Sequence, residues 1–596
     1  MRKKRILAVV LACLLLAGCG PHRTEPVPEQ KIDPSRPTGE VIAYVPLDDR
    51  PDNVGRVVYL AESLGYALEM PEADTYRTRL NGQPLNENGT QSGDRAALYE
   101  WLLAQETAGC DRYVIAMDQL LSGGLVNSRD MTEAEEITLS DGTVLTEEEL
   151  LEQMMAVLAA DTENRVWLMD SVMRLAPTVG YRNWTLEEYN ALREYGAQPR
   201  QELPDGAGVE AVTAEYRLGP DGQTIDITAF GLEDWEVEQY LSARGRKLRL
   251  TDRMLQLRGG ACEHMRVLIG IDDSSDADSI QKPEIDYLRT LLHEEDALLS
   301  GVDDLAFKAV AKLYLEETGW NGADVSVTYF GGTEDKPACA YDYKALTEIV
   351  EEHFDFFGLT NVGTGAEELA VLVLTQPADS TQATTYYNEL IKRLNQNREM
   401  GLPTILVDAG NGQYGTTFHE ALTEKVELGW LLSYAGFLDM AIVTGTALSH
   451  GVARYAFLRQ GQQADTTERA FARTLADSIL KDFCYKHIVR NDILNYVRGD
   501  LAGSADNFWQ PDIDREAVLA RMRAGMDAAV QPVIENLERS NMISALGEST
   551  YAERGWGGVE TTGYYFPWDR AFEIEMQILL GAFTEPHEKV LGVYYK

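Results

Sequence analysis

Acidic residues follow several apolar runs in this chain, in an arrangement suited to general acid–base chemistry. Residues 41–47 run into Asp48, Asp49 and Arg50, and residues 265–271 run into Asp272 and Asp273. Adjacent carboxyl groups in a partly buried pocket repel each other, so one can stay protonated near neutral pH while the other is ionised. The Asp272–Asp273 pair is therefore the candidate for a general acid beside a stabilising carboxylate.

We expect Asp273 to act as the general acid and Asp272 to stabilise developing positive charge. The pair is similar to the adjacent Asp pair at a barrel-strand end in secreted N-acetylhexosaminidases, in which the acetamido group of the substrate is the nucleophile. Further charged residues follow other apolar runs and are expected to hold substrate hydroxyl groups. These expected substrate-binding residues are Asp48, Asp49, Arg50, Asp118, Arg129, Asp170 and Arg174.

Two other uses of these acids remain open. An Asp that follows a strand often caps the next helix, and this explanation is strongest for Asp303 and Asp304, which directly precede a helical pattern. Clustered Asp without nearby His or Cys also suits Ca²⁺ or Mg²⁺. Because Asp272, Asp276 and Asp278 do not match an EF-hand loop, we expect no metal ligands and no cofactor, with Ca²⁺ or Mg²⁺ as the alternative.

The elements that must position these residues alternate between apolar runs and amphipathic stretches. Near-continuous apolar strands separated by helices indicate an α/β fold with a parallel sheet covered on both faces. About eight such strands are enough for a (β/α)8-like barrel, which we favour over an open doubly wound sheet. The expected strands are residues 41–47, 67–70, 112–117, 166–169, 265–271, 297–302, 325–330 and 371–375.

The expected domain limits follow these elements. Residues 40–400 form the α/β catalytic domain, with an insertion at 196–232 whose Pro-Asp-Gly turns predict a β-hairpin. Residues 401–596 form a C-terminal α/β to mostly helical region. In that region we expect strands at 404–407 and 440–443 and helices at 467–484 and 515–539.

The N-terminus resembles a bacterial lipoprotein signal. A basic segment at residues 2–5 precedes an apolar stretch at 6–17 that is too short to span a membrane, and small residues then lead to Cys19. We expect residues 1–18 to be removed, Cys19 to carry the lipid and residues 19–39 to form a tether. The protein would then be extracytoplasmic and lipid-anchored to the bacterial cell membrane.

The composition narrows the range of partners. Lys and Arg number 53 against 96 Asp and Glu, and the formal net charge of −43 repels phosphate backbones, so we expect no nucleic-acid partner. The sequence has no glycine-rich dinucleotide loop or P-loop, which argues against a nucleotide cofactor. The eight histidines show no close pair, so no zinc centre is expected. The sequence does not decide whether Cys110, Cys262, Cys339 and Cys484 form disulfides.

Four motifs together resemble a large bacterial family of secreted or lipoprotein proteins that is filed as a domain of unknown function. The resemblance spans roughly residues 40–580 and implies one continuous unit. The family's Gly-Trp-Asn-Thr pattern is replaced here at residues 436–439. The motifs are Val45-Pro46-Leu47-Asp48-Asp49-Arg50-Pro51, Gly123-Gly124-Leu125 with Ser128-Arg129, Gly270-Ile271-Asp272-Asp273, and Phe566-Pro567-Trp568 with Arg570, Phe572 and Glu573.

These features favour a surface-anchored glycoside hydrolase with a carbohydrate substrate, acting on amino-sugar-containing glycans. The first alternative is a non-catalytic glycan- or peptidoglycan-binding lipoprotein, in which Trp556 and Trp568 would stack on sugar rings. The second alternative is a divalent-metal-dependent hydrolase. The favoured function requires that the acids at the strand ends line one concave pocket.

Overall fold

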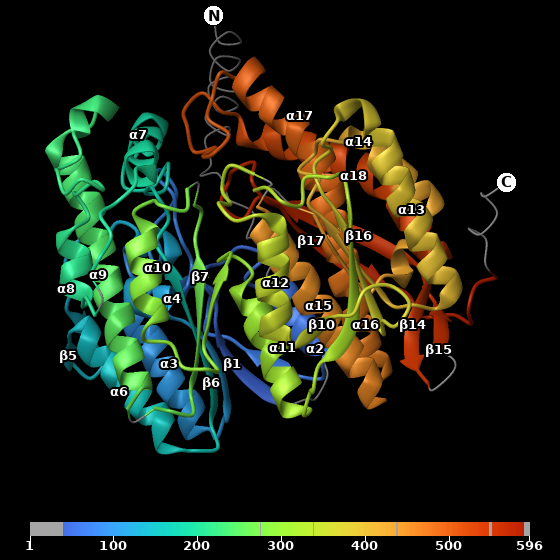
Figure 1. Ribbon diagram of the computed structural model, residues 1–596, viewed down its shortest axis with the longest axis horizontal. Coiled ribbons are helices and arrows are strands. Elements are labelled where there is room, and N and C mark those ends of the chain that lie inside the picture. Colours follow the sequence, from blue (N-terminus) through green and yellow to red (C-terminus); the bar gives the residue numbers. More distant parts are fainter. Residues whose placement is uncertain are drawn as a thin grey trace, which may run out of the picture. The chain divides into compact units, whose positions relative to one another are not determined.

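The computed structural model describes residues 40–588, apart from residues 205, 261, 275, 338, 437–438 and 548–550. Within this part of the chain, parallel strands form two separate sheets, one of six strands and one of five. Helices cover both faces of each sheet (Figure 1). The expected signal peptide, the lipidation site Cys19 and the tether lie outside the described residues.

The first sheet has the strand order β2-β1-β3-β6-β7-β8, and every neighbouring pair is parallel. The register places Tyr44 opposite Val114 and Asp170 opposite Ile269. The strands agree with the expected ones apart from small differences at their ends. They are β1 (Val41–Val45), β2 (Ala67–Glu69), β3 (Arg112–Ala116), β6 (Arg165–Val172), β7 (Arg266–Ile271) and β8 (Ala297–Ser300).

The second sheet has the order β10-β9-β11-β12-β13, again with parallel pairs throughout. Both sheets share one topology: the second strand in the chain lies at an edge beside the first, and the chain then crosses to the other side of the first strand. This is a doubly wound order. The strands are β9 (Ala323–Phe330), β10 (Leu359–Asn361), β11 (Leu369–Leu374), β12 (Thr404–Asp408) and β13 (Ser433–Ala435).

The favoured closed barrel is not found in the described residues, and the open doubly wound alternative describes both sheets. The first sheet is open because β2 and β8 form its two edges. Strand and helix lengths are similar in the two fold types, so the local sequence pattern did not separate them. The expected domain limit at residue 400 falls between β11 and β12, which are neighbours in the second sheet.

Alternating strand residues pack into different cores on the two faces of each sheet. Ile42 and Tyr44 of β1 belong to the core between the sheets, whereas Ala43 and Val45 belong to the core on the outer face. This alternation explains why the strands read as continuous apolar runs, since both faces are buried. The core between the sheets is built on α2 (Gly55–Ser63), α11 (Leu305–Glu317), α12 (Leu346–Phe357) and α15 (Met440–Gln460).

The outer faces are covered by other helices. In Figure 1 the outer helices of the first sheet lie on the left and those of the second sheet on the right. The first group is α3 (Arg95–Thr107), α4 (Met117–Ser122), α5 (Leu125–Ser128), α6 (Glu147–Ala160), α7 (Leu186–Ala197), α9 (Asp234–Arg258) and α10 (Gln281–Arg289). The second is α13 (Ala383–Met400), α14 (Gly415–Lys425), α16 (Asp465–Ser478), the π-helix η5 (Ile479–Val489), α17 (Arg490–Asn495) and α18 (Arg515–Arg539).

Two local expectations were wrong. Residues 440–443 form the first turn of the helix α15 and not a strand. The insertion at 196–232 contains α8 (Val209–Ala214), a 3-10 turn and a single antiparallel bridge between Leu218 and Thr224 in place of a hairpin. The C-terminal region ends in two strand pairs, which are β14 (Asn541–Leu546) with β15 (Tyr551–Gly555) and β16 (Val559–Tyr565) with β17 (Glu575–Leu580).

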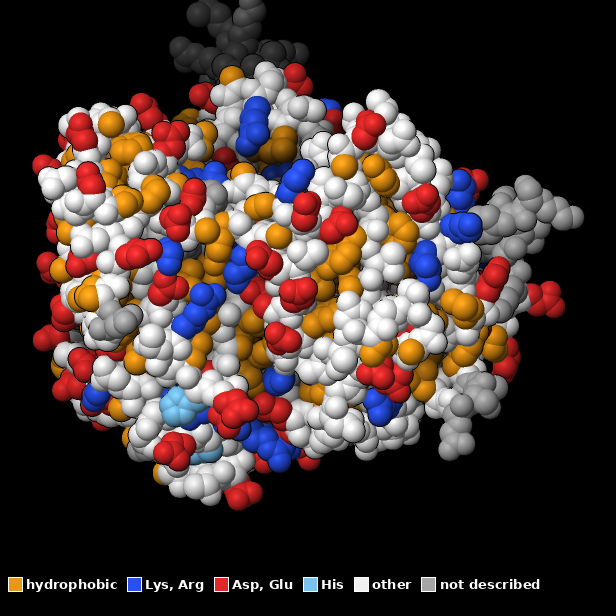
Figure 2. Space-filling view, in the orientation of Figure 1, with side chains coloured by type: hydrophobic (Ala, Val, Ile, Leu, Met, Phe, Trp, Pro, Cys, Tyr) orange, Lys and Arg blue, Asp and Glu red, His pale blue; other side chains and the backbone are white. Residues whose placement is uncertain are grey.

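The face shown in Figure 2 carries its negative charge without concentrating it. Acidic side chains are spread over the face shown in Figure 2, with basic side chains among them. None of the helices within the described ranges has the length and apolar character needed to cross a membrane. The thiols of Cys110, Cys262, Cys339 and Cys484 are unpaired.

Candidate active site

Arg50 joins the ends of two strands of the first sheet. It follows β1, and its Nε donates to Asp48 at 2.9 Å, while Nη1 and Nη2 donate to the two carboxylate oxygens of Asp303 at 2.9 and 2.6 Å. Asp303 follows β8 and was expected to serve a helix start. Its bidentate pairing with Arg50 instead links the segment after β1 to the segment after β8 at the carboxyl edge of the sheet.

Asp48 and Asp49 point to different partners, although they are adjacent. The buried Asp48 carboxylate accepts from the backbone N–H of Arg50 at 2.9 Å and from Asn53 at 3.0 Å, so it holds the turn after β1. Asp49 accepts from the indole N–H of Trp568 at 2.8 Å. Burial, followed by the charge of Asp48, raises the pKa of Asp49 to about 6, against the lowering effect of the Trp568 hydrogen bond.

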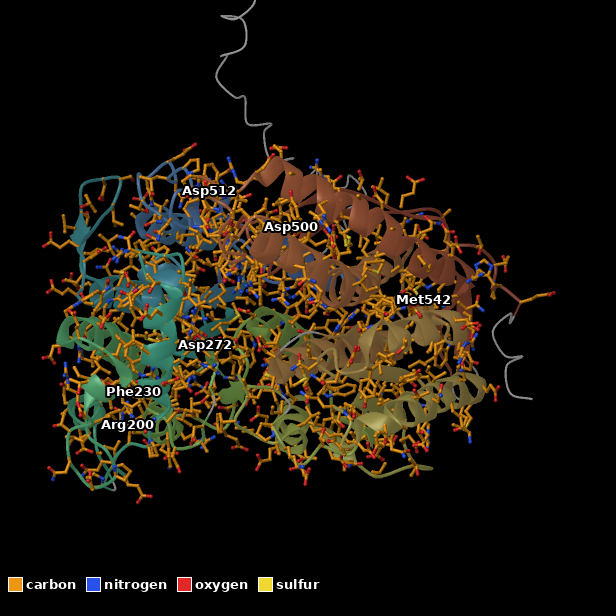
Figure 3. All side chains as sticks on the ribbon, turned by 90° about the horizontal axis from the view of Figure 1, so that it is seen from above. Arg200, Phe230, Asp272, Asp500, Asp512 and Met542 are labelled. Carbon is orange, nitrogen blue, oxygen red and sulfur yellow. The ribbon has the colours of Figure 1, made fainter. Side chains whose placement is uncertain are left out.

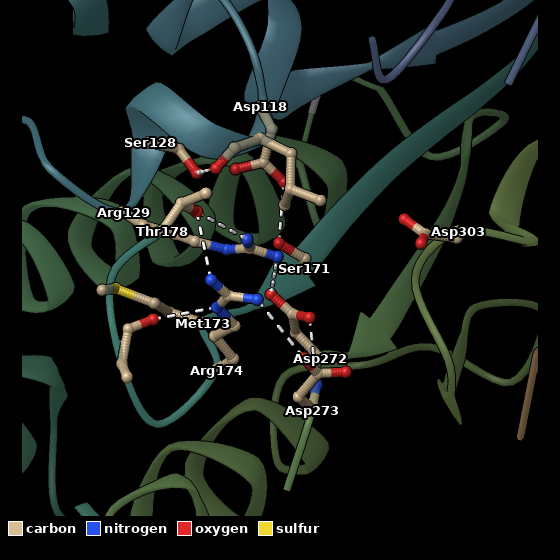
Figure 4. Close-up of polar contacts among 12 residues, drawn as sticks. Asp118, Ser128, Arg129, Ser171, Met173, Arg174, Thr178, Asp272, Asp273 and Asp303 are labelled. Carbon is tan, nitrogen blue, oxygen red and sulfur yellow. Dashed lines mark hydrogen bonds and ion pairs between the residues drawn. The ribbon is translucent and has the colours of Figure 1, made fainter. Parts of the chain in front are cut away.

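Asp272 and Asp273 follow β7 and contact two arginines, as Figure 4 shows. Arg129 donates to the Asp272 carboxylate, whose other oxygen accepts from the backbone N–H of Asp273 at 3.0 Å. Arg174 reaches Asp273 at 3.3 Å. Both guanidinium groups also donate to the Thr178 hydroxyl at 3.1 Å. The structure thus brings together four of the expected site residues, Arg129, Arg174, Asp272 and Asp273.

Asp273 is the more accessible member of the pair. Its side chain is 25% exposed, whereas that of Asp272 is 6% exposed. Burial and then the charge of Asp272 raise the pKa of Asp273 to about 6, although Arg174 and Arg129 act in the opposite direction. Near pH 6, Asp273 is therefore close to its titration midpoint and can donate or accept a proton.

Two further carboxyl groups influence Asp273. Burial disfavours ionisation of Asp303, but the charge of Arg50 outweighs it and keeps the pKa of Asp303 below its usual value. Asp439, at the N-terminus of α15, has a pKa well above its usual value because it is buried and faces the charges of Asp273 and Asp342. The pKa values of Asp303 and Asp439 are therefore shifted in opposite directions within one site, which is the usual basis of acid–base assignments.

Asp118 and Asp170 lie together, but as a buried ion-pair network. The Lys247 ammonium of α9 pairs with both carboxylates, at 2.8 Å from Asp170. Ser171 donates to Asp118 at 2.7 Å and Thr251 donates to Asp170 at 2.5 Å. Because this cation and these hydroxyls already satisfy the carboxylates, their contacts are those of a structural ion pair and differ from the expected hold on substrate.

A narrow pocket opens beside Asp303, between the carboxyl ends of the two sheets. Its volume of about 10 Å³ has room for about one water molecule. The acids that line it are Asp52, Asp303 and Asp482, so the expected lining by Asp48, Asp118, Asp170 and the Asp272–Asp273 pair is not found. The other lining residues are Arg56, Phe307, Ala435, Ile442, Val443, Thr446 and Lys486.

The aromatic residues near Asp273 differ from the expected ones. Trp556 and Trp568 are 1% and 2% exposed, so neither offers a free ring face to a sugar. Tyr189 and Tyr341 are instead half-buried. The pKa of Tyr341 is raised mainly by burial, then by Tyr189, and to a smaller extent by the charge of Asp273. Arg174 lies 5.4 Å from the Tyr189 ring. In Figure 3 the labelled insertion residues Arg200 and Phe230 lie nearer the edge of the view than Asp272. The insertion contacts the loop after β7, because the Arg200 backbone N–H donates to the Asp278 carbonyl at 3.2 Å.

A second polar group lies at the carboxyl end of β12 in the other sheet. Asp408, His419 of α14 and His487 of η5 are close enough to hold a metal ion, with their ligand atoms within 4.8 Å of one another. The histidines are not paired in the sequence, but the fold brings His419 and His487 together from two helices that are distant along the chain. No group containing Asp272, Asp276 and Asp278 has this compactness within the described ranges.

Sequence reasoning missed several residues of both groups. Asp303 and Asp408 each follow an apolar strand, so the rule that selected Asp272 could also have selected them. Asp439 lies where the chain departs from the family pattern, which is a weaker signal. Nothing local in the sequence marks the partners Lys247 and His487, because each comes from a helix far along the chain.

Comparison with known proteins identifies a family. The model of a family of proteins of unknown function, DUF4127, matches residues 42–577. This match covers most of the chain, so the chain belongs to that family. No curated protein and no solved structure gives a significant match.

Proposed function

We propose that this member of the DUF4127 family is a glycoside hydrolase in which Asp273 protonates the glycosidic oxygen. The observation that carries the proposal is a pair of carboxyl groups in opposite environments after the neighbouring strands β7 and β8. Burial and Asp272 raise the pKa of Asp273 to about 6, whereas Arg50 outweighs burial and keeps Asp303 ionised. A protonated acid beside an ionised carboxylate is the combination used in glycoside hydrolysis.

In this proposal the charge-stabilising role moves from Asp272 to Asp303. Both oxygens of Asp272 already accept hydrogen bonds, from Arg129 and from the backbone of Asp273. Asp272 would therefore position Asp273 and raise its pKa. Asp303 lines the water-sized pocket, so its negative charge can stabilise an oxocarbenium-like transition state with the hydrolytic water beside it.

Substrate contact would come from the side on which Asp273 is exposed. Tyr341 is tied to the Asp273 loop, because its carbonyl accepts from the Ser274 backbone at 2.9 Å. Half-buried tyrosines provide both a ring face for the apolar side of a sugar and a hydroxyl for hydrogen bonding. We retain amino-sugar-containing glycans as the substrate class, on the similarity of the Asp272–Asp273 pair to that of N-acetylhexosaminidases.

The location is part of the proposal. Residues 2–19 have the basic, apolar and small-residue pattern of a lipoprotein signal that ends in Cys19. With a lipid on Cys19 and residues 20–39 as a tether, the site would face glycans outside the bacterial cell membrane.

The test is release of reducing sugar from a glycan library by the full chain. We expect Asp273→Asn to lower turnover by about 100-fold or more, because general acid catalysis contributes at least that much. A substrate with an acidic phenol as leaving group needs little protonation and should lose less. Asp276→Asn, an exposed change in the same loop, is the matched control and should keep activity.

Two results would contradict the proposal. Turnover that is unchanged in both Asp273→Asn and Asp303→Asn would remove the assigned roles. Glycan binding without any release of sugar by the wild-type chain would favour the non-catalytic binding protein instead.

A further inference from the structure

Asp408, His419 and His487 form a compact buried cluster in the second sheet, here named the Asp408 cluster. The Nε2 atoms of His419 and His487 lie 3.4 and 3.9 Å from Oδ2 of Asp408. The side chains of Asp408 and His419 are each 3% exposed, and that of His487 is 7% exposed. The two imidazole rings face each other with centroids 4.6 Å apart.

The cluster leaves buried polar atoms without hydrogen bonds. Neither ring nitrogen of His419 has a hydrogen-bond partner in the described part of the chain, and neither does Nε2 of His487. Leaving such a group unsatisfied costs about 1–3 kcal/mol, so several of them in one place call for an explanation. A bound cation would satisfy nitrogens from both rings and one carboxylate oxygen at once.

Unsatisfied nitrogens alone do not define a metal site, as His450 shows. Both of its ring nitrogens also lack hydrogen bonds, and it is buried. Its surroundings differ, because it packs on Phe471 and faces the positive charge of Arg454. His450 therefore has the burial of the cluster histidines but lacks the carboxylate and the second imidazole.

The spacing of the ligand atoms fits a tetrahedral ion. With metal–ligand bonds of about 2.0–2.1 Å, ligand atoms lie about 3.4 Å apart. The observed distances of 3.4 and 3.9 Å from the two rings to Asp408 are close to this value, and all three ligand atoms lie within 4.8 Å of one another. Two imidazoles and one carboxylate suit Zn²⁺ and similar ions, whereas Ca²⁺ and Mg²⁺ prefer oxygen ligands alone.

The surrounding structure holds the ligands in place. Oδ1 of Asp408 accepts from the Gly410 backbone at 3.2 Å, and Oδ2 accepts from the Tyr434 hydroxyl at 3.1 Å. The Phe483 ring packs edge-on against His419 with centroids 4.2 Å apart. Supporting contacts of this kind orient metal ligands in known sites.

We propose that the Asp408 cluster binds a divalent transition-metal ion of the Zn²⁺ class, with Nε2 of both histidines and a carboxylate oxygen of Asp408 as its protein ligands. Three protein ligands leave a fourth position for water, which is the pattern of catalytic rather than structural zinc sites. The cluster contains none of the residues of the Asp273 group, and the proposal does not depend on the glycoside hydrolase proposal.

The experiment uses the full chain after treatment with EDTA, with ZnCl₂ and CoCl₂ as probes. We expect about one Zn²⁺ per chain by elemental analysis, visible absorption bands of tetrahedral Co²⁺, and a rise in melting temperature on adding Zn²⁺. Asp408→Asn, His419→Gln and His487→Gln should each weaken Zn²⁺ affinity by about 100-fold or more. His450→Gln is the matched control and should keep the affinity.

The outcomes separate clearly, because binding is measured without any substrate. Thermal unfolding of each metal-free variant is also measured. Loss of Zn²⁺ binding is used as evidence only for variants that still unfold cooperatively and are therefore folded. If the wild type binds no Zn²⁺, or if the three variants and His450→Gln bind it equally well, the proposed metal site is refuted. Preferential binding of Ca²⁺ or Mg²⁺ over Zn²⁺ would overturn the assigned class of ion.

Discussion

Replacement of Asp273 by Asn should stabilise the protein at neutral pH while it lowers turnover by about 100-fold or more. In the folded state the pKa of Asp273 is raised from 3.8 to about 6, mainly by burial and by Asp272. The native state therefore binds this proton more tightly than the unfolded state does. As pH rises through the window between these two values, the wild type loses free energy of unfolding.

The size of this loss follows from the shift. A change from 3.8 to about 6 is roughly two pKa units, and at about 1.4 kcal/mol per unit it costs up to about 3 kcal/mol once the group is ionised. Asparagine keeps an oxygen that can accept from Arg174, but it carries no charge. Asp273→Asn should thus gain up to about 3 kcal/mol over the wild type at about pH 7.5 and close to nothing at about pH 4.

Asp303→Asn provides a control of opposite sign. Because Arg50 outweighs burial and lowers the pKa of Asp303, its ionised form stabilises the native state above the usual pKa of an Asp. This contribution disappears as pH falls through the lowered pKa. The Asp303→Asn variant should therefore be less stable than the wild type at neutral pH, with a gap that closes toward acid.

The assay is urea unfolding of the full chain and both variants at several pH values, taken as differences from the wild type. Taking differences cancels the contributions to the free energy of unfolding from the many other groups that titrate in the same pH range. The reasoning fails if Asp273→Asn is not more stable than the wild type at about pH 7.5, or if its advantage does not vary between about pH 4 and 7.5. A stability gain coupled to lost turnover would mark Asp273 as a group retained for function.

Two further changes test the scaffold by the same unfolding assay. Lys247→Met leaves Asp118 and Asp170 buried without their cation and should cost about 3–5 kcal/mol; a loss below about 1 kcal/mol would show that water satisfies them. Gly445→Ala places a Cβ 1.7 Å from a buried carboxylate oxygen and should cost about 1–3 kcal/mol. Gly499→Ala, which meets open space, is its control and should not destabilise the chain.

The strands were predictable because each is buried on both faces and therefore reads as an apolar run. The arrangement of the strands was not, since the position of a strand in a sheet depends on where the preceding helix crosses. The error at residues 440–443 has a different cause. Helix α15 is buried around nearly its whole circumference, so its sequence lacks the periodic polar face that separates a helix from a strand.

The same signal, an acid at a strand end, led to different outcomes in the site. For Asp273 it indicated a partly exposed acid beside two arginines. For Asp118 and Asp170 it indicated residues whose partner Lys247 comes from a helix elsewhere in the chain. A sequence shows the acid but not the group that neutralises it, and that group decides between a structural ion pair and a reactive carboxyl group.

The same distinction applies to two buried acids at equivalent positions in the two sheets. Their strand orders coincide, so β6 and β12 occupy the same fourth place in the chain order of each sheet. Each carries a buried Asp near its carboxyl end: Asp170 in β6 and Asp408 in β12. Asp170 faces the ammonium group of Lys247, whereas the ion-pair partners of Asp408 in the described residues are two imidazoles. A buried carboxylate needs a compensating cation. Lys247 supplies it in the first sheet, and the metal ion that we propose for the Asp408 cluster would supply it in the second.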